Sequence, residues 1–278
     1  MLALIRRARH GPLRGWAPMW TILGRLYRGT LDTLNLRTTV TMRIGPYGPF
    51  KLDGRFAFSN YEAWGGGKNA GFQACVEASS GARCVLDVGA HIGLVSLPMS
   101  RAVAPGGRVY VFEPADFNRA LLRRHVALNG ADNIEVVGDL VGERDENEVA
   151  FYEKDADTGL NTVAVRPGQS SFFKTRKRQI CLDTFCERRG LEPDVIKIDV
   201  EGAEVGVLRG AVRTLRRFRP IIFLSVHPRQ LRLLGHDVAE LSRLIGEFGY
   251  DCRSVSGSEV SELEGQEYLL QPRGAAGR

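Results

Sequence analysis

The sequence predicts an α/β protein built around a mostly parallel sheet with helices on both faces. Short β-branched runs alternate with helical stretches from residue 84 onward, which is the pattern of consecutive βαβ units. Of the 278 residues, 44% are hydrophobic and 25% are charged, which excludes collagen-like, disordered and disulfide-scaffold proteins. The length suits one large domain or two small ones.

The predicted elements follow in a regular order. Five buried strands are expected over residues 84–88, 109–112, 134–137, 195–198 and 221–226. Helices are expected over residues 93–103, 115–129, 203–217 and 238–248. Two weaker strands complete the domain, near residues 250–255 and 267–270. The alternation pauses over residues 147–180, where runs at 148–152 and 162–165 indicate an inserted β-hairpin.

The positive charge is concentrated in the first 50 residues. That segment holds eight Arg, no Lys and one acid, Asp32, so it carries +7, whereas the whole chain carries +6. A nucleic-acid enzyme more often has a basic surface around its active site, so we expect no nucleic-acid partner. We divide the chain into a basic leader (1–50), one α/β domain (51–272) and a disordered tail (273–278).

The leader contains a candidate amphipathic helix over residues 16–36, where apolar side chains recur at helical spacing. This helix could contact an anionic membrane surface or pack on the protein's own body, and we favour packing. The apolar run at residues 1–5 is too short for a signal peptide, and no stretch reaches the ~18 apolar residues of a transmembrane helix. Five Cys without a C-x-x-C pair indicate reduced thiols. We therefore expect a cytoplasmic protein, with the leader as the candidate for membrane association.

The segment 87–93, DVGAHIG, joins the first predicted strand to its helix. Gly89 would let the backbone turn tightly near a ligand, and Gly93 would let the helix pack close to the strand. The dinucleotide fingerprint G-x-G-x-x-G is absent. Asp87 suits a ligand with a positive amine or sulfonium better than it suits a pyrophosphate. His91 lies in the same loop, where we expect its backbone to matter more than its ring.

Glu113 stands 20 residues after Gly93, at the end of the second predicted strand. A carboxylate there can hold a ribose diol through two charge-assisted hydrogen bonds. Together, Asp87 and Glu113 describe a nucleoside with a cationic end, so we predict S-adenosylmethionine as the cofactor. Asp139, after the third strand, is a candidate partner for the adenine amino group, with a local capping role as the alternative.

Acidic residues and a histidine follow the fourth and fifth predicted strands. Asp199 stands at a strand end, and Glu201 and Glu204 follow near the start of the next helix, where capping is the alternative role. His227 is expected across the crevice from Asp199 and could act as a general base for a hydroxyl. We take Asp199, Glu201 and His227 as catalytic candidates. We assign no metal ligand, although the three acids could instead bind a divalent cation.

Four motifs together resemble the FkbM-type methyltransferases. They are DVGAHIG at 87–93, FEP at 112–114, LDT at 182–184 and IKIDVEGAE at 196–204. The resemblance implies a seven-stranded, Rossmann-like class I methyltransferase fold, use of S-adenosylmethionine, and O-methylation. The chain departs from the family pattern at His91, where an Asn is usual. It departs again after the fifth strand, where Ser225 and His227 replace a frequent Glu.

We therefore predict an S-adenosylmethionine-dependent O-methyltransferase that acts on a hydroxyl of a sugar, glycolipid or natural-product acceptor. An NAD-dependent oxidoreductase is the alternative enzyme, disfavoured by the missing third Gly of the fingerprint. A non-catalytic, membrane-docked binding protein is the alternative outside enzymes. Titration with S-adenosylmethionine and with NAD would separate the three.

Overall fold

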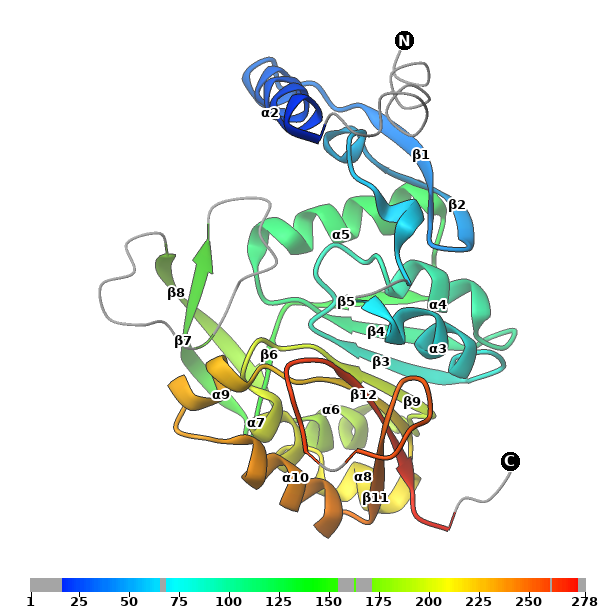
Figure 1. Ribbon diagram of the computed structural model, residues 1–278, viewed down its shortest axis with the longest axis vertical. Coiled ribbons are helices and arrows are strands. Elements are labelled where there is room, and N and C mark those ends of the chain that lie inside the picture. The colour runs from blue at the N-terminus through cyan, green and yellow to red at the C-terminus, as the bar shows by residue number, and fades with distance from the viewer. Residues whose placement is uncertain (1–16, 66–68, 155–162, 164–171, 261, 275–278) are drawn as a thin grey trace.

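Figure 1 shows the computed structural model of the chain, which describes residues 17–65, 69–154, 163, 172–260 and 262–274. Among them, seven strands form one sheet in the order β11-β12-β10-β9-β3-β4-β5. Their bounds are β3 (Cys84–Val88), β4 (Arg108–Phe112), β5 (Ile134–Val137), β9 (Val195–Ile198), β10 (Ile221–Ser225), β11 (Tyr250–Ser254) and β12 (Glu267–Pro272). The direction of β12 is opposite to that of the other six strands, so it pairs antiparallel with both β10 and β11. The predicted mostly parallel sheet is confirmed, and every strand lies within two residues of its expected bounds.

The central strands bury both of their faces, so side chains at alternating positions enter two different cores. In β3, Leu86 and Val88 enter one core and Val85 enters the other. The first core is covered by α6 (Leu182–Arg189), α7 (Glu204–Arg209), α8 (Val212–Phe218), α9 (Pro228–Leu233) and α10 (Val238–Glu247). The second is covered by α3 (Gly71–Ala78), α4 (Ser96–Ala102) and α5 (Asp116–Asn129). Figure 1 shows these two helical layers on opposite sides of the sheet.

The single helix expected over residues 203–217 is instead two helices, α7 and α8, which break at Gly210. A Cβ atom on Gly210 would lie only 2.0 Å from the carbonyl oxygen of Gly142, so the chain passes too close to a neighbouring segment for a side chain. The buried carboxylate of Asp183 then caps the first turn of α8, because it accepts a hydrogen bond from the Thr214 N–H at 2.7 Å. The expectation was wrong because the break depends on a contact distant in sequence.

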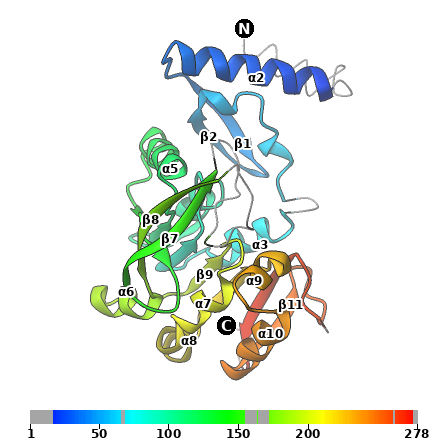
Figure 2. The ribbon, with the colours of Figure 1, turned by 90° about the vertical axis from the view of Figure 1, so that its left-hand side faces the viewer.

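The expected leader is joined to the α/β body. After α2 (Ala17–Thr33), β1 (Thr39–Ile44) and β2 (Tyr47–Asp53) form an antiparallel hairpin, so the boundary expected at residue 50 falls inside a strand. The backbone N–H of Asp53 donates to Nε2 of His125 in α5 at 3.0 Å. Figure 2 shows this hairpin between α2 and the rest of the molecule. Residues 1–16, and most of the tail expected over 273–278, lie outside the described residues.

Helix α2 has one packed face and one exposed face. Trp20 and Leu31 are each 6% exposed, and the rings of Trp20 and Tyr27 lie 6.5 and 5.4 Å from that of Phe58. Another set of apolar side chains on the helix is exposed, namely Ile22, Leu23 and Leu26. The helix therefore packs on the protein's own body and still presents an apolar strip.

An inserted β-hairpin is present, with a second strand later than expected. β7 (Glu146–Lys154) pairs antiparallel with β8 (Phe172–Ile180), and the short β6 (Leu140–Val141) pairs parallel with β8. Of the second run expected at 162–165, only Val163 is described; the rest lies outside the described residues. All five cysteines, which are described, are free thiols. No helix in the described part of the chain combines the length and hydropathy needed to cross a bilayer.

Candidate active site

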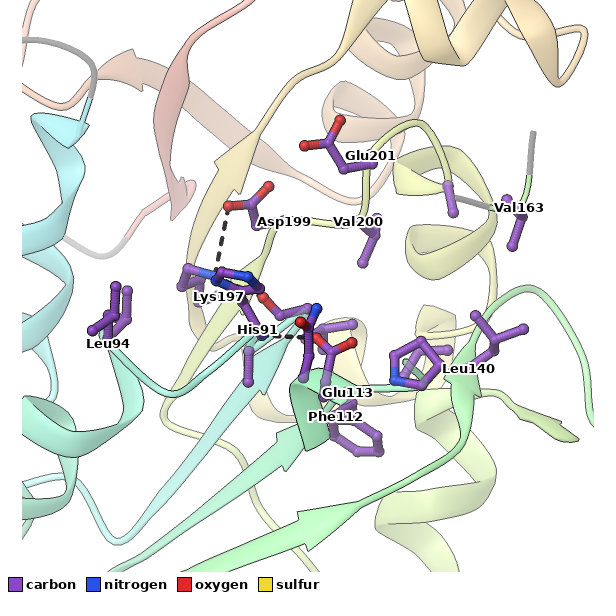
Figure 3. A pocket seen from close by; sticks show the side chains of 18 of the residues that line it. His91, Leu94, Phe112, Glu113, Leu140, Val163, Lys197, Asp199, Val200 and Glu201 are labelled. Carbon is purple, nitrogen blue, oxygen red and sulfur yellow. Dashed lines mark hydrogen bonds and ion pairs between the residues drawn. The ribbon is translucent and has the colours of Figure 1, made fainter. Parts of the chain in front are cut away.

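A crevice of about 270 Å³ opens at the carboxyl ends of the central strands. This is the edge where open α/β sheets bind their ligands. Six of the nine predicted site residues line it: Gly89, His91, Glu113, Asp139, Asp199 and Glu201. Three do not, namely Asp87, Gly93 and His227. Figure 3 shows the carboxylates of Glu113, Asp199 and Glu201 around the same space.

Glu113 is fixed at the end of β4 by backbone donors. Its Oε2 accepts a hydrogen bond from the His91 N–H at 2.8 Å, and its Oε1 accepts one from the Ala115 N–H at 3.0 Å. Burial raises the pKa of Glu113 to about 7, although these hydrogen bonds oppose the rise. The Asn118 side chain also donates to this carboxylate, whose two oxygens together offer about four lone-pair sites. The Glu113 carboxylate is therefore placed to accept two hydrogen bonds from a diol of the ligand.

The backbone of the loop 89–93 adopts conformations that few side chains tolerate. His91 has φ +52°, a left-handed conformation in which His and Asn are both enriched. This explains physically how His can stand where the family that the motifs resemble usually has Asn. Its N–H is the donor to Glu113, so the backbone of His91 takes part in the site, while its ring lines the crevice.

The two glycines of this loop allow close approaches that differ from those expected. Gly89 has φ +85°, and a Cβ there would lie 1.8 Å from the carbonyl oxygen of Asp199, so this glycine lets β3 and β9 end side by side. Gly93 has φ +86°, and its Cβ would lie 2.5 Å from the Leu122 side chain in α5. The partner of Gly93 is therefore this helix, not the strand that we expected.

Asp87 lies beneath the crevice. It is fully buried, its Oδ2 accepts from the Ser96 hydroxyl at 2.6 Å, and its Oδ1 accepts from Nζ of Lys197 at 3.1 Å. Lys197 in turn lines the crevice, with Nζ 3.9 Å from Oδ2 of Asp199. Desolvation lowers the pKa of Lys197, but the charges of Asp87 and Asp199 outweigh it and raise that pKa. Asp87 thus acts on the crevice through Lys197.

Asp139 lies at the other end of the crevice with its carboxylate already paired. Arg178 of β8 donates to it through both Nε, at 3.0 Å, and Nη2, at 2.5 Å. The residue still lines the crevice. Arg178 therefore ties the inserted hairpin to the end of β5.

Three carboxylates surround the imidazole of His227. Its Nδ1 donates to Oε1 of the fully buried Glu204 at 2.7 Å. Its Nε2 lies 3.5 Å from Oδ1 of Asp199 and 3.7 Å from Oε1 of Glu201. Asp199 and Glu201 line the crevice, so His227 stands behind them. The cluster joins the end of β9 to the end of β10. We expected His227 across the crevice from Asp199, but it lies beside Asp199 and does not line the crevice.

The charges of this cluster alter its titration. Desolvation lowers the pKa of His227, but its hydrogen bond to Glu204 and the charges of Glu201 and Asp199 raise it overall to about 9. At neutral pH the ring of the free protein is therefore protonated on both nitrogens and positively charged. The expectation that His227 titrates near neutral pH is wrong, because three acids from one loop converge on it.

Two charged residues of the crevice were missed in the sequence. Lys197 carried a signal, since a lysine in the otherwise apolar strand Val195–Ile198 must find a buried acid. Glu267 begins the weakly patterned β12, and its Oε2 accepts from the Gly71 N–H at 2.8 Å. Burial raises the pKa of Glu267. Nothing in its local sequence indicated a place in the crevice.

Comparison with solved structures finds many chains of similar architecture. An FkbM methyltransferase from Methylobacillus flagellatus shares 22% identity with a TM-score of 0.46, over 69% of this chain and 44% of that one. A precorrin-6y C5,15-methyltransferase from Geobacter metallireducens shares 12% identity with a TM-score of 0.43, over 73% and 86%. An O-methyltransferase from Bacillus cereus, solved with SAH, shares 16% identity with a TM-score of 0.39, over 72% and 77%. This chain therefore spans less than half the length of the Methylobacillus protein.

A search of curated proteins by sequence found no match. The methyltransferase FkbM domain, in contrast, matches residues 87–252, which is more than half of the chain and includes the loop, Glu113 and the acidic cluster. This match confirms the expectation of an FkbM-type methyltransferase domain, and the seven-stranded sheet described above confirms the predicted fold class. The chain belongs to the FkbM methyltransferase family.

Proposed function

We propose that this methyltransferase binds S-adenosylmethionine in the crevice and transfers its methyl group to a hydroxyl of a sugar, glycolipid or natural-product acceptor. The observation that carries the proposal is the position of Glu113. Its carboxylate is fixed by two backbone N–H groups and lines the same crevice as Asp199 and Glu201. An acid that can bind the ribose of the cofactor and acids that can orient an acceptor hydroxyl thus line the same crevice.

In this proposal the cofactor lies along the ends of β3, β4 and β5. Glu113 accepts hydrogen bonds from the ribose diol. The loop 89–93 holds the methionine part, with Asp87 acting from below through Lys197. Asp139 borders the adenine, where Arg178 fixes its carboxylate. Asp87 and Gly93 therefore support the cofactor without touching it, which refines the roles given to them from the sequence.

The acceptor enters from the side of Asp199. Its hydroxyl oxygen attacks the methyl carbon, the O–C bond forms as the C–S bond breaks, and the electron pair stays on sulfur to give S-adenosylhomocysteine. The hydroxyl proton is lost to the acidic cluster or to solvent. Such a reaction needs in-line positioning more than strongly reactive groups. Asp199 and Glu201 would orient the hydroxyl, and His227 would hold them in place from behind.

A labelling experiment tests this function. The protein is incubated with S-adenosylmethionine carrying a labelled methyl group and with separate lipid, glycan and small-metabolite extracts of the native host, and labelled products are identified by mass. We expect a product with a new methyl ether. A labelled amine, thiol or nucleic acid as the product would contradict the assignment, and so would binding of NAD in place of S-adenosylhomocysteine.

We also propose that the exposed strip of α2, formed by Ile22, Leu23 and Leu26, rests on an anionic membrane surface. These side chains are 57%, 39% and 65% exposed. Arg25 and Arg28 lie on the same helix, and the first 50 residues carry eight Arg against one acid. Apolar side chains interleaved with cations are the pattern of an interfacial helix. The proposal leaves the packed face of α2 in contact with Phe58.

A further inference from the structure

The cluster behind the crevice gathers three potential metal-ligand atoms. One atom each from Asp199, Glu201 and His227 lies within 4.8 Å of the others. The two carboxylate oxygens are 3.5 and 3.7 Å from Nε2 of His227, which is longer than a hydrogen bond. Neighbouring ligands of an octahedral ion with bonds of about 2.1 Å lie roughly 3 Å apart. A small contraction would therefore bring these atoms around one ion.

Each of the three ligand groups is oriented by a second contact that leaves its ligand atom facing the others. Glu204 accepts from Nδ1 of His227 at 2.7 Å, so Nε2 is the nitrogen that can bind a cation, which displaces its proton to solvent. Gln230 donates to Oε2 of Glu201 at 3.0 Å, and Oε1 is the oxygen that faces Nε2 of His227, at 3.7 Å. Nζ of Lys197 lies 3.9 Å from Oδ2 of Asp199 and leaves Oδ1. Such outer contacts are typical of protein metal sites.

A buried unpaired oxygen adds an independent observation. Glu204 is fully buried, and its Oε2 has no hydrogen-bond partner in the part of the chain that the structure describes. A buried carboxylate is costly unless a positive charge compensates it. Besides the imidazole of His227, the cation near the three acids is Lys197, and its Nζ is already bonded to a fourth acid, Asp87. A divalent cation would supply further positive charge.

We propose that Asp199, Glu201 and His227 bind a divalent cation, with Glu204 as the residue that positions the imidazole. The mixture of two carboxylates and one imidazole suits a transition-metal ion such as Mn²⁺ better than it suits Ca²⁺. From the sequence alone we assigned no metal ligand. The alternative that we left open there was a cation bound by Asp199, Glu201 and Glu204. The structure differs from that alternative because His227 supplies the third ligand, whereas Glu204 lies outside the ligand set.

The role of the cation rests on the proposed function. Asp199 and Glu201 line the crevice, so an ion held by them has its open positions on the acceptor side. A bound hydroxyl loses its proton more easily because the cation stabilises the resulting alkoxide. The cation would therefore reduce the need for a strong general base, because the hydroxyl proton could pass directly to solvent water, and it would also orient the oxygen toward the methyl group.

The test measures binding of Mn²⁺ alone to the whole, metal-stripped protein, by calorimetry and by the Mn²⁺ electron paramagnetic resonance signal. We expect one site in the wild type. His227→Ala and Asp199→Asn should each weaken binding at least tenfold, and Glu204→Gln should weaken it about 10–100-fold, as loss of an outer contact does. His236→Ala is the matched control, because His236 also pairs with a glutamate, at 2.9 Å, outside this cluster. We expect it to bind Mn²⁺ like the wild type.

Absence of Mn²⁺ binding in the wild type would overturn the inference, and so would unchanged binding in both His227→Ala and Asp199→Asn. Asp199 is 37% exposed, so its substitution keeps the test valid if His227→Ala does not fold. S-adenosylhomocysteine is titrated into the same samples. Cofactor binding without Mn²⁺ binding would contradict the metal site alone, whereas Mn²⁺ binding without cofactor binding would contradict the proposed function alone.

Discussion

Nζ of Lys197 lies 3.1 Å from Oδ1 of Asp87; both side chains are buried, and Lys197 lines the crevice above Asp87. They lie opposite one another on adjacent parallel strands, because Asp87 of β3 is in register with Lys197 of β9. The pair is therefore set by the sheet itself. It connects the loop that follows β3 with Asp199, which follows Lys197 at the end of β9.

We predict that Lys197→Met destabilises the protein by about 3–5 kcal/mol, because it leaves Asp87 as an unpaired buried charge. Asp87→Asn should also destabilise. The double variant should lose less than the sum of the two single losses, since no charge remains buried alone. Urea unfolding measures all three. Strictly additive losses would show that the pair is not coupled.

A second prediction concerns the left-handed backbone of His91. His91→Asn should preserve both stability and affinity for S-adenosylhomocysteine, because Asn adopts φ near +52° readily. His91→Val should cost about 1–3 kcal/mol of stability, because a β-branched residue is strained there. Thermal unfolding and calorimetry compare the two variants. Equal behaviour of Asn and Val would show that the backbone conformation is not the constraint.

The raised pKa of Glu113 makes a prediction about pH. Only the ionised carboxylate accepts two hydrogen bonds from the ribose diol, and its pKa is about 7 in the free protein. Affinity for S-adenosylhomocysteine should therefore fall as the pH drops through about 7, by roughly tenfold between pH 8 and pH 6. In Glu113→Ala the profile should be flat over this range. A fall of equal size in that variant would assign the titration to another group.

The membrane proposal predicts separable effects on the two faces of α2. Leu26→Glu should reduce salt-sensitive sedimentation with anionic vesicles and leave cofactor binding unchanged, because Leu26 is 65% exposed. Leu233→Glu is the matched control, since Leu233 is an exposed leucine of α9 and is 41% exposed. Undiminished sedimentation of Leu26→Glu would contradict the membrane contact. Removing residues 1–40 is a poorer test, because it also deletes the buried Trp20.

The sheet was predictable from sequence because its strands are short apolar runs bounded by strong turn signals. Cys84–Val88 is completely buried and leads directly into Gly89. The β1–β2 hairpin was missed although Thr39–Ile44 alternates polar and apolar residues, because our interpretation of the first 50 residues rested on their arginines. The break at Gly210 was missed because its cause, the carbonyl of Gly142, is distant in sequence.

The positions of the site residues were predictable, but several of their partners were not. Strand ends meet at one edge of a parallel sheet, so Glu113 and Asp199 were expected in one crevice, and both line it. The local sequence around a buried polar residue does not reveal which distant residue will be its hydrogen-bond or ion-pair partner. Asp87 is held by Lys197, and His227 by Glu204, through contacts 110 and 23 residues apart. These partners decide charge and accessibility, so the roles of Asp87 and His227 changed once the structure was known.

The central claim is that the crevice around Glu113 binds the cofactor, and calorimetric titration with S-adenosylhomocysteine tests it most directly. The wild type should bind at one site, and Glu113→Ala should bind at least tenfold more weakly, because it loses charge-assisted hydrogen bonds worth about 1.5–3 kcal/mol each. Glu187→Ala, which removes an exposed carboxylate paired with Arg213 outside the crevice, should bind like the wild type. An unchanged dissociation constant in a folded Glu113→Ala protein would contradict the account.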